Sequence, residues 1–331
     1  MDFSSDNPII NYISYLDYMY YIVLIKLRES IIFRLIGDIL KQIAFYGKGG
    51  IGKSTTVCNL AAALSKSGKK VIVVGCDPKH DCTSNLRCGE DIPTVLDVLR
   101  EKGIDKLGIE TIIRENLLKK EDIIYEGFNG IYCVEAGGPK PGYGCAGRGV
   151  IVVIDLLKKM KVFEELGVDV VLYDVLGDVV CGGFAMPLRM GLADQIYVVT
   201  SSDYMALYAA NNICNGINQF VKRGGSTLGG IIYNVRGSMD AFDIVSEFAS
   251  QLNANIIGKV PNSPIINEAE IDGQTAIEYA PEEEISKIYM ELAEKIYENN
   301  TGTTPNPLEN AQIMQIGKMI KERIKKQKIV E

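Results

Sequence analysis

Short apolar runs alternate with longer stretches of helical periodicity from residue 41 onward. We predict strands at the apolar runs, which are residues 42–46, 71–75, 131–135, 168–173, 195–200 and 228–233. We predict helices at the periodic stretches, which are residues 53–66, 149–166, 203–222 and 238–252. Strands that alternate with helices favour an α/β fold, in which helices cover both faces of a mostly parallel sheet. Ligands of such sheets bind beyond the carboxyl ends of the strands.

The 331 residues are enough for one large domain or two ordinary ones. No internal repeat or second domain is evident, so we predict one α/β domain over residues 41–302. A proline-containing break at 303–307 precedes a C-terminal tail and helix, which we assign to residues 303–331. Residues 1–40 are predicted to be an extension of unassigned role. Its apolar stretch is too short to span a membrane, and acidic residues replace the positive start of a signal peptide.

Composition narrows the class of partner. The net charge of −7 and the pI near 5.1 argue against nucleic acid as the main partner, and we expect no membrane partner. A protein surface or a small electron donor fits better. Eight cysteines without any C-x-x-C pair predict a reducing, cytoplasmic location and exclude zinc ribbons and thioredoxin-like motifs. The single histidine, His80, is too isolated to ligate a metal, so a partner contact and an ordinary surface position both remain open.

A glycine-rich loop after the first predicted strand matches the phosphate-binding P-loop, Gly-x-x-x-x-Gly-Lys-Ser. Its glycines let backbone N–H groups turn toward a phosphate, and the following helix adds its positive end. Lys53 is expected to bind the terminal phosphates, and the Ser54 hydroxyl to bind Mg²⁺. The predicted nucleotide-binding residues of the loop are Gly47, Lys48, Gly49, Gly50, Ile51, Gly52, Lys53, Ser54 and Thr55.

Carboxylates follow two further predicted strands. Asp77 and Asp81 come after the second strand, and Asp174 and Asp178 come after a later one. Such residues can hold the magnesium shell or orient the attacking water, and Gly177 can offer its N–H to a γ-phosphate. Singly, each aspartate could instead be a helix cap. In this order after a P-loop, we interpret them as two nucleotide-sensing switches, and we predict Lys48, Asp77, Asp81, Asp174 and Asp178 as the catalytic residues.

Two cysteines, Cys145 and Cys181, are bracketed by glycines, which leave backbone amides free to approach a sulfur ligand. Two thiolates are half of the four that a cubane cluster needs, and a second chain on a two-fold axis could supply the others. The other six cysteines fall on predicted helices, on or at the ends of strands, or near the first switch, without ligand-like surroundings. Spacing alone leaves open whether Cys145 and Cys181 are ligands or structural thiols.

Several segments resemble the nitrogenase iron protein family. They are residues 47–56, Cys76-Asp-Pro-Lys79, Gly137-Gly-Pro, Gly144-Cys-Ala-Gly-Arg-Gly149, residues 173–187 and Met205-Ala-Leu-Tyr-Ala-Ala-Asn-Asn212. The resemblance covers the chain from about residue 41 to its C-terminal region.

This resemblance implies a homodimer whose axis carries one 4Fe-4S cluster, held by Cys145 and Cys181 of each subunit. It implies that MgATP binding and hydrolysis gate one-electron transfer from a low-potential donor such as ferredoxin to a larger catalytic iron–sulfur protein. Lys48 marks the deviant class of P-loops, in which this lysine reaches the nucleotide of the other subunit. Asn234 matches the adenine-contacting asparagine of the family. Arg148 matches its partner-docking arginine, which some members regulate by ADP-ribosylation.

The motifs of this chain resemble more than one branch of the family. Cys-Ala-Gly-Arg-Gly and Met-Ala-Leu-Tyr-Ala-Ala-Asn resemble true nitrogenase reductases, whereas residues 79–81, 92–97 and 135–138 look more like the light-independent protochlorophyllide reductase component. Residues 233–236 and 260–265 also depart from the nitrogenase pattern near the expected adenine site. This mixture resembles the archaeal group that serves as the reductase component of Ni-sirohydrochlorin a,c-diamide reductive cyclase. We therefore expect nickel-tetrapyrrole reduction, with a dinitrogenase reductase as the alternative. A non-redox positioning ATPase of the deviant P-loop class is the alternative from a different functional class.

Overall fold

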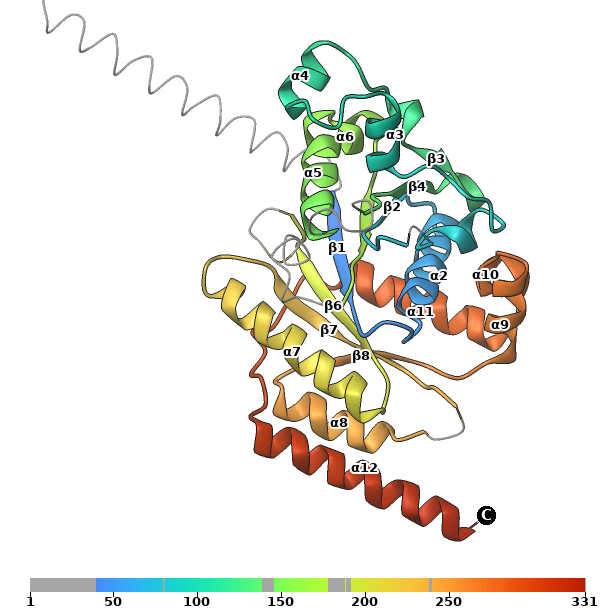
Figure 1. The fold of residues 1–331 in the computed structure, drawn as a ribbon. Coiled ribbons are helices and arrows are strands. Elements are labelled where there is room, and N and C mark those ends of the chain that lie inside the picture. Colours follow the sequence, from blue (N-terminus) through green and yellow to red (C-terminus); the bar gives the residue numbers. More distant parts are fainter. Residues whose placement is uncertain are drawn as a thin grey trace, which may run out of the picture. The chain divides into compact units, whose positions relative to one another are not determined.

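The computed structural model describes residues 40–79, 81–138, 146–177, 188, 192–237 and 240–330, without the side chains of 146, 148 and 328–330. In these residues the chain builds one eight-stranded sheet in the order β3-β4-β2-β5-β1-β6-β7-β8 (Figure 1). All strand pairs are parallel except β3 with β4. The strands are β1 (Lys41–Tyr46), β2 (Val71–Gly75), β3 (Tyr125–Glu126), β4 (Tyr132–Glu135), β5 (Val170–Asp174), β6 (Gln195–Thr200), β7 (Thr227–Asn234) and β8 (Ile256–Val260).

Helices cover both faces of this sheet, with α2 and α11 on one face and α7 and α8 on the other (Figure 1). The α-helices are α2 (Lys53–Lys66), α3 (Val95–Glu101), α4 (Ile109–Arg114), α5 (Ala146–Lys159), α6 (Val162–Leu166), α7 (Tyr204–Val221), α8 (Phe242–Gln251), α9 (Pro264–Ile271), α10 (Ala276–Tyr279), α11 (Glu284–Glu298) and α12 (Asn310–Val330). The predicted α/β fold, with a mostly parallel sheet between helices, is confirmed.

Burial of both faces explains why the strands are continuous apolar runs and do not alternate with polar residues. In β1, Ile43 and Phe45 belong to the core cluster that α2 and α11 complete, whereas Ala44 and Tyr46 point to the opposite face. All four side chains are fully buried. The centre of the sheet is therefore a rigid base for the loops that follow its strands.

Two helix predictions differ from the structure. The stretch 149–166 is two helices, α5 and α6, because Lys161 adopts a left-handed backbone conformation with φ of 51°. Helix α8 begins at Phe242, four residues later than the predicted start of 238. The strand β8 and the helices α9 to α11 were not predicted. In β8 only Val260 is buried, so its hydrophobic signal is weak.

The C-terminal segment packs on the α7 and α8 side of the sheet (Figure 1). Thr303 exchanges two backbone hydrogen bonds with Leu228 of β7, at 2.8 and 3.0 Å. Further along, Asn211 of α7 donates to and accepts from the backbone of Leu308, at 3.0 and 2.8 Å. The segment that precedes α12 is therefore attached to the main sheet and to α7. In the described part of the chain, no helix is long and apolar enough to cross a membrane.

Candidate nucleotide-binding site

The glycine-rich loop joins the carboxyl end of β1 to the start of α2, as predicted. Gly52 has φ of 85°, a conformation that favours glycine, and it stands at the N-terminal end of α2 without a capping side chain. No acidic side chain lies in the first turn of α2. The first backbone N–H groups of this helix are therefore available to an anion such as phosphate.

A cavity of about 610 Å³ lies against this loop. Its volume is within the roughly 300–1,000 Å³ that small-molecule pockets occupy. Residues from the P-loop and from both predicted switches line it: Gly47, Lys48, Gly49, Gly50, Gly52, Lys53, Ser54, Thr55, Asp77, Pro78, Lys79, Asp81, Leu176 and Arg236. The fold thus brings the P-loop together with Asp77 and Asp81.

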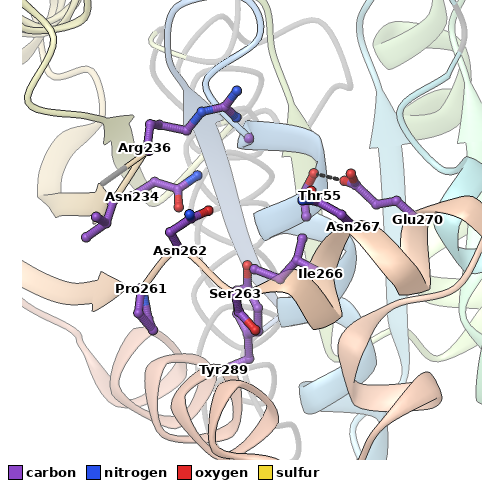
Figure 2. Close-up of a pocket in the computed structure, with 13 residues that line it drawn as sticks. Thr55, Asn234, Arg236, Pro261, Asn262, Ser263, Ile266, Asn267, Glu270 and Tyr289 are labelled. Atoms are coloured by element: carbon purple, nitrogen blue, oxygen red, sulfur yellow. Dashed lines mark hydrogen bonds between the residues drawn. The ribbon is translucent and has the colours of Figure 1, made fainter. Parts of the chain in front are cut away.

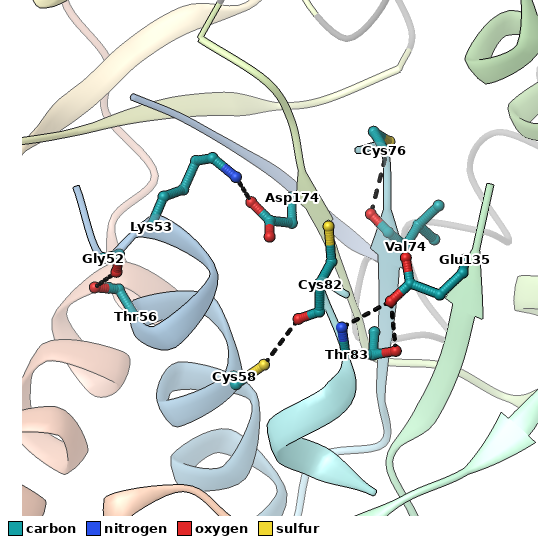
Figure 3. A network of polar contacts seen from close by, with 10 residues as sticks. All are labelled: Gly52, Lys53, Thr56, Cys58, Val74, Cys76, Cys82, Thr83, Glu135 and Asp174. Atoms are coloured by element: carbon teal, nitrogen blue, oxygen red, sulfur yellow. Dashed lines mark hydrogen bonds and ion pairs between the residues drawn. The ribbon is translucent and has the colours of Figure 1, made fainter. Parts of the chain in front are cut away.

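A buried ion pair joins Lys53 of the P-loop to Asp174 at the end of β5 (Figure 3). The two side chains are 7% and 0% exposed. Burial by itself lowers the pKa of Lys53, but the Asp174 carboxylate outweighs it, so the net direction is a raised pKa and Lys53 stays protonated. The second carboxylate oxygen of Asp174, Oδ2, is buried and has no hydrogen-bond partner in the described part of the chain. An unpaired carboxylate oxygen beside a P-loop fits the hydration shell of Mg²⁺.

The chain after β5 touches the P-loop directly. A Cβ added to Gly177 would overlap the carbonyl oxygen of Gly47 and lie 3.2 Å from the backbone N of Lys48. Only glycine allows the two backbones to come this close. The N–H of Val175 also donates to the carbonyl of Phe45 in β1, at 3.0 Å. The segment after Asp174 therefore lies in direct contact with the P-loop and with β1.

The remaining predicted residues of the switches differ in exposure. Asp77 is half-buried and its Oδ1 accepts the N–H of Lys79 at 2.9 Å, whereas Asp81 is exposed. Lys48 is also exposed, and Ser54 is half-buried. His80, Cys145, Asp178 and Cys181 lie outside the described residues, as does the side chain of Arg148. The predictions for these five residues stay predictions.

Figure 2 shows the lining of a second, smaller cavity of about 180 Å³. This cavity shares Gly52, Thr55 and Arg236 with the first. Asn234, only 8% exposed, lines it and donates its amide to the carbonyl of Ile51 at 2.7 Å. The Thr55 hydroxyl donates to Glu270 from α9. This places the predicted adenine-contacting asparagine beside the P-loop.

Several residues of this cavity were missed as site residues by the sequence reasoning: Arg236, Pro261, Asn262, Ser263, Ile266, Asn267, Glu270 and Tyr289. The segments after β7 and β8 carried a signal, because polar residues and proline follow the ends of apolar runs there. Tyr289 carried none, since it lies in the middle of the amphipathic helix α11.

Six cysteines lie in the described residues, and the structure supports a structural role for most of them. Cys58, Cys76, Cys82, Cys133 and Cys214 are buried, whereas Cys88 is exposed. Burial raises the pKa of Cys133 and of Cys214 to about 12. These two thiols therefore stay protonated and are poor metal ligands.

The parallel α/β sheet, the glycine loop between β1 and α2, and the aspartates at neighbouring strand ends define a P-loop nucleotide-binding protein. Solved structures agree on the fold. The septum site-determining protein MinD complexed with Mg-ADP from Pyrococcus horikoshii matches with a TM-score of 0.57 and 22% identity, over 78% of this chain and 96% of that one.

Sequence comparison identifies the family. Residues 41–323 match the model of the 4Fe-4S iron–sulfur cluster binding proteins of the NifH/frxC family. A nitrogenase iron protein 2 of Methanothermococcus thermolithotrophicus is 77% identical over 290 residues, 88% of this chain and 99% of the relative. A nitrogenase iron protein of Methanococcus voltae is 52% identical over 287 residues, 87% of this chain and 99% of the relative.

The chain therefore belongs to the NifH/frxC family, which confirms the resemblance to nitrogenase iron proteins. It is an ATP-hydrolysing iron–sulfur oxidoreductase component. Its cofactors are MgATP and a 4Fe-4S cluster that bridges a homodimer. Members of this family work with a larger catalytic partner and a ferredoxin-type donor.

Proposed function

We propose that this chain is the reductase component of a two-component enzyme, in which MgATP drives single electrons to a larger catalytic iron–sulfur protein. The observation that carries the proposal is the Lys53–Asp174 ion pair, together with the contact of Gly177 on the P-loop. These features connect a phosphate-binding lysine to the strand end whose chain continues to Cys181.

The Lys53 ammonium has three N–H donors, so a bound terminal phosphate would share it with Asp174 or replace Asp174 as its partner. Where the phosphate replaces Asp174, the buried carboxylate needs a new partner. A magnesium-bound water fits this need, because Asp174 Oδ2 already lacks a hydrogen bond. Cys181 is only four residues beyond Gly177 in the sequence, so a shift at the strand end is transmitted over a short length of chain. We assign Asp178 to this transmission.

Cys145 and Cys181 of both subunits would hold the cluster, which supplies the one-electron redox chemistry. Two observations on the chain support this assignment. The buried thiols of Cys133 and Cys214 are held protonated, so they are poor alternatives. Both proposed ligands also follow segments that the structure ties to the nucleotide site, at Gly138 and at Gly177.

Three further roles complete the proposal. Lys48, exposed at the P-loop, would contact the nucleotide of the other subunit in the homodimer. Asn234 would contact adenine from the smaller cavity, next to the P-loop. Arg148 would dock the catalytic partner. A cytoplasmic location fits the eight cysteines, which need a reducing compartment.

The electron acceptor is proposed to be a nickel tetrapyrrole on a reductive cyclase. The mixed sequence signature around residues 79–81, 92–97 and 135–138 supports this substrate class. The printed names of the relatives favour the second candidate, a nitrogenase iron protein that supplies electrons for dinitrogen reduction. Purified catalytic partners of both kinds, tested with the reduced protein and MgATP, distinguish the two acceptors.

The reductase function is tested by anaerobic purification. We expect brown protein with about four irons per dimer, and loss of that iron in Cys145→Ala and in Cys181→Ala. Lys53→Ala should keep the iron but lose every response of the cluster to MgATP. A colourless protein that hydrolyses ATP would refute the reductase proposal and would support the non-redox positioning ATPase.

A further inference from the structure

Glu135, the last residue of β4, is a fully buried carboxylate that the nucleotide site does not use. Its Oε1 accepts two hydrogen bonds from Thr83, one from the backbone N–H at 2.7 Å and one from the hydroxyl at 2.6 Å (Figure 3). Two bonds from one residue to one oxygen fix both the position and the direction of the chain at Thr83. Oε2 is buried and has no hydrogen-bond partner among the described residues.

The same carboxylate touches both ends of the first switch, residues 76–82. Thr83 follows this segment, and Gly75 precedes it. In the sheet, Gly75 pairs with Glu135 on one side and with Asp174 on the other. A Cβ added to Gly75 would overlap Glu135 Oε2, so the absence of a side chain at Gly75 makes room for the carboxylate.

The chain that leaves β4 packs on the switch as well. A Cβ added to Gly138 would lie 2.7 Å from the Cβ of Pro78, in the middle of the switch. Arg100 of α3 donates to the carbonyl of Gly138 and holds this backbone from the other side. Pro78 and Thr83 therefore both contact residues 135–138. Cys145 follows Gly138 by seven residues.

We propose that Glu135 is a positioning residue that transmits movement of residues 76–83 to the chain leading to Cys145. The inference rests on the proposed function, in which Asp77 and Asp81 respond to MgATP and Cys145 ligates the cluster. It adds a second route from the nucleotide to the cluster, separate from the route through Asp174 and Gly177. The first route reaches Cys181, and the second reaches Cys145.

The test compares two substitutions at Glu135 in the iron-loaded homodimer. Glu135→Met keeps the length of the side chain but removes both acceptor oxygens, whereas Glu135→Gln keeps an amide oxygen for Thr83. The readouts are the rate at which a ferrous chelator removes iron and the midpoint potential of the cluster, each with and without MgATP. Calorimetry measures MgATP affinity.

We expect Glu135→Met to reduce the MgATP-induced change in chelation rate by about tenfold or more, because it removes both hydrogen bonds that Thr83 donates. The MgATP-induced shift in potential should fall with it. The Kd for MgATP should stay within about threefold of wild type, because Glu135 does not line the nucleotide cavity. Glu135→Gln should retain most of the wild-type response. A full response in Glu135→Met would overturn the proposal, and so would an equal loss in Glu135→Gln.

A second pair of variants decides the question if Glu135→Met does not fold. Thr83→Val removes the hydroxyl donor and leaves the backbone N–H bond, whereas Thr83→Ser keeps both. We expect the MgATP response to fall by about threefold or more in Thr83→Val and to stay at the wild-type level in Thr83→Ser. Equal responses in the two variants would overturn the proposal. Failure of the proposed function would be visible earlier, as wild-type protein without iron or without any MgATP response.

Discussion

Removing Lys53, the buried first residue of α2, should strongly destabilise the nucleotide-free protein. Lys53→Met keeps most of the apolar length of the side chain but leaves the Asp174 carboxylate buried and uncompensated. Asp174 is 0% exposed, and its Oδ2 has no hydrogen-bond partner among the residues that the structure describes. Loss of one partner of a buried ion pair costs about 3–5 kcal/mol.

The magnitude can be measured as a melting temperature. For a chain longer than 250 residues, 1 kcal/mol corresponds to about 2 °C, so we expect Lys53→Met to melt about 6–10 °C below wild type. The assay is far-ultraviolet circular dichroism of iron-loaded, nucleotide-free protein under anaerobic conditions. All variants are heated at one scan rate, because irreversible unfolding makes the midpoint depend on that rate.

Two control variants test whether the loss of stability comes from the uncompensated charge of Asp174. Lys48→Met changes a lysine in the same loop that is exposed, so its midpoint should stay within about 1 °C of wild type. The double variant Lys53→Met/Asp174→Asn removes the stranded charge and should recover at least about 2 kcal/mol relative to the two single changes added together. Equal melting midpoints for Lys53→Met and Lys48→Met would show that the buried ion pair does not stabilise the fold. Additive effects of Lys53→Met and Asp174→Asn would show that the two side chains are not energetically coupled.

Three further predictions concern the surroundings of the P-loop. Gly177→Ala should keep the iron and the fold but lose the MgATP response of the chelation rate, because the added Cβ would overlap the carbonyl oxygen of Gly47; an unchanged response would contradict the proposed contact. Asn234→Ala removes the hydrogen bond that the side-chain amide donates to the carbonyl of Ile51. The variant should weaken MgATP binding by about fivefold to tenfold in calorimetry, the equivalent of about 1 kcal/mol. Burial raises the pKa of Glu135 from 4.5 to about 7, so the folded protein holds this proton more tightly than the unfolded chain does. The stability from this group is present below pH 4.5 and is lost as the pH rises to about 7, at a cost of up to about 3 kcal/mol. In Glu135→Gln, the melting temperature should not show this decline between about pH 5 and 8. If wild type and Glu135→Gln lose melting temperature equally over this range, Glu135 is not the group that causes the decline.

Features that depend on neighbouring residues could be predicted from the amino-acid sequence. The P-loop could be predicted because its glycines, Lys53 and Ser54 are contiguous, and the backbone geometry of such a loop follows from local residue types. The buried strands could be predicted because burial on both faces requires continuous apolar runs. The break at Lys161 escaped prediction, since a left-handed residue inside a periodic stretch leaves the hydrophobic pattern unchanged.

Contacts between residues far apart in the sequence depend on how the strands are arranged in the sheet. Lys53 and Asp174 are 121 positions apart, and Asn234 and Ile51 are 183 apart. Their contacts depend on the strand order, in which β5 and β6 flank β1 and β7 lies beyond β6. A hydrophobic pattern specifies that a strand is buried but not which strand lies beside it, so the order could not be read from the pattern. The same holds for Glu135, an acidic residue at the end of an apolar run. Its hydrogen bond from Thr83 depends on the pairing of β4 with β2, which the hydrophobic pattern does not specify.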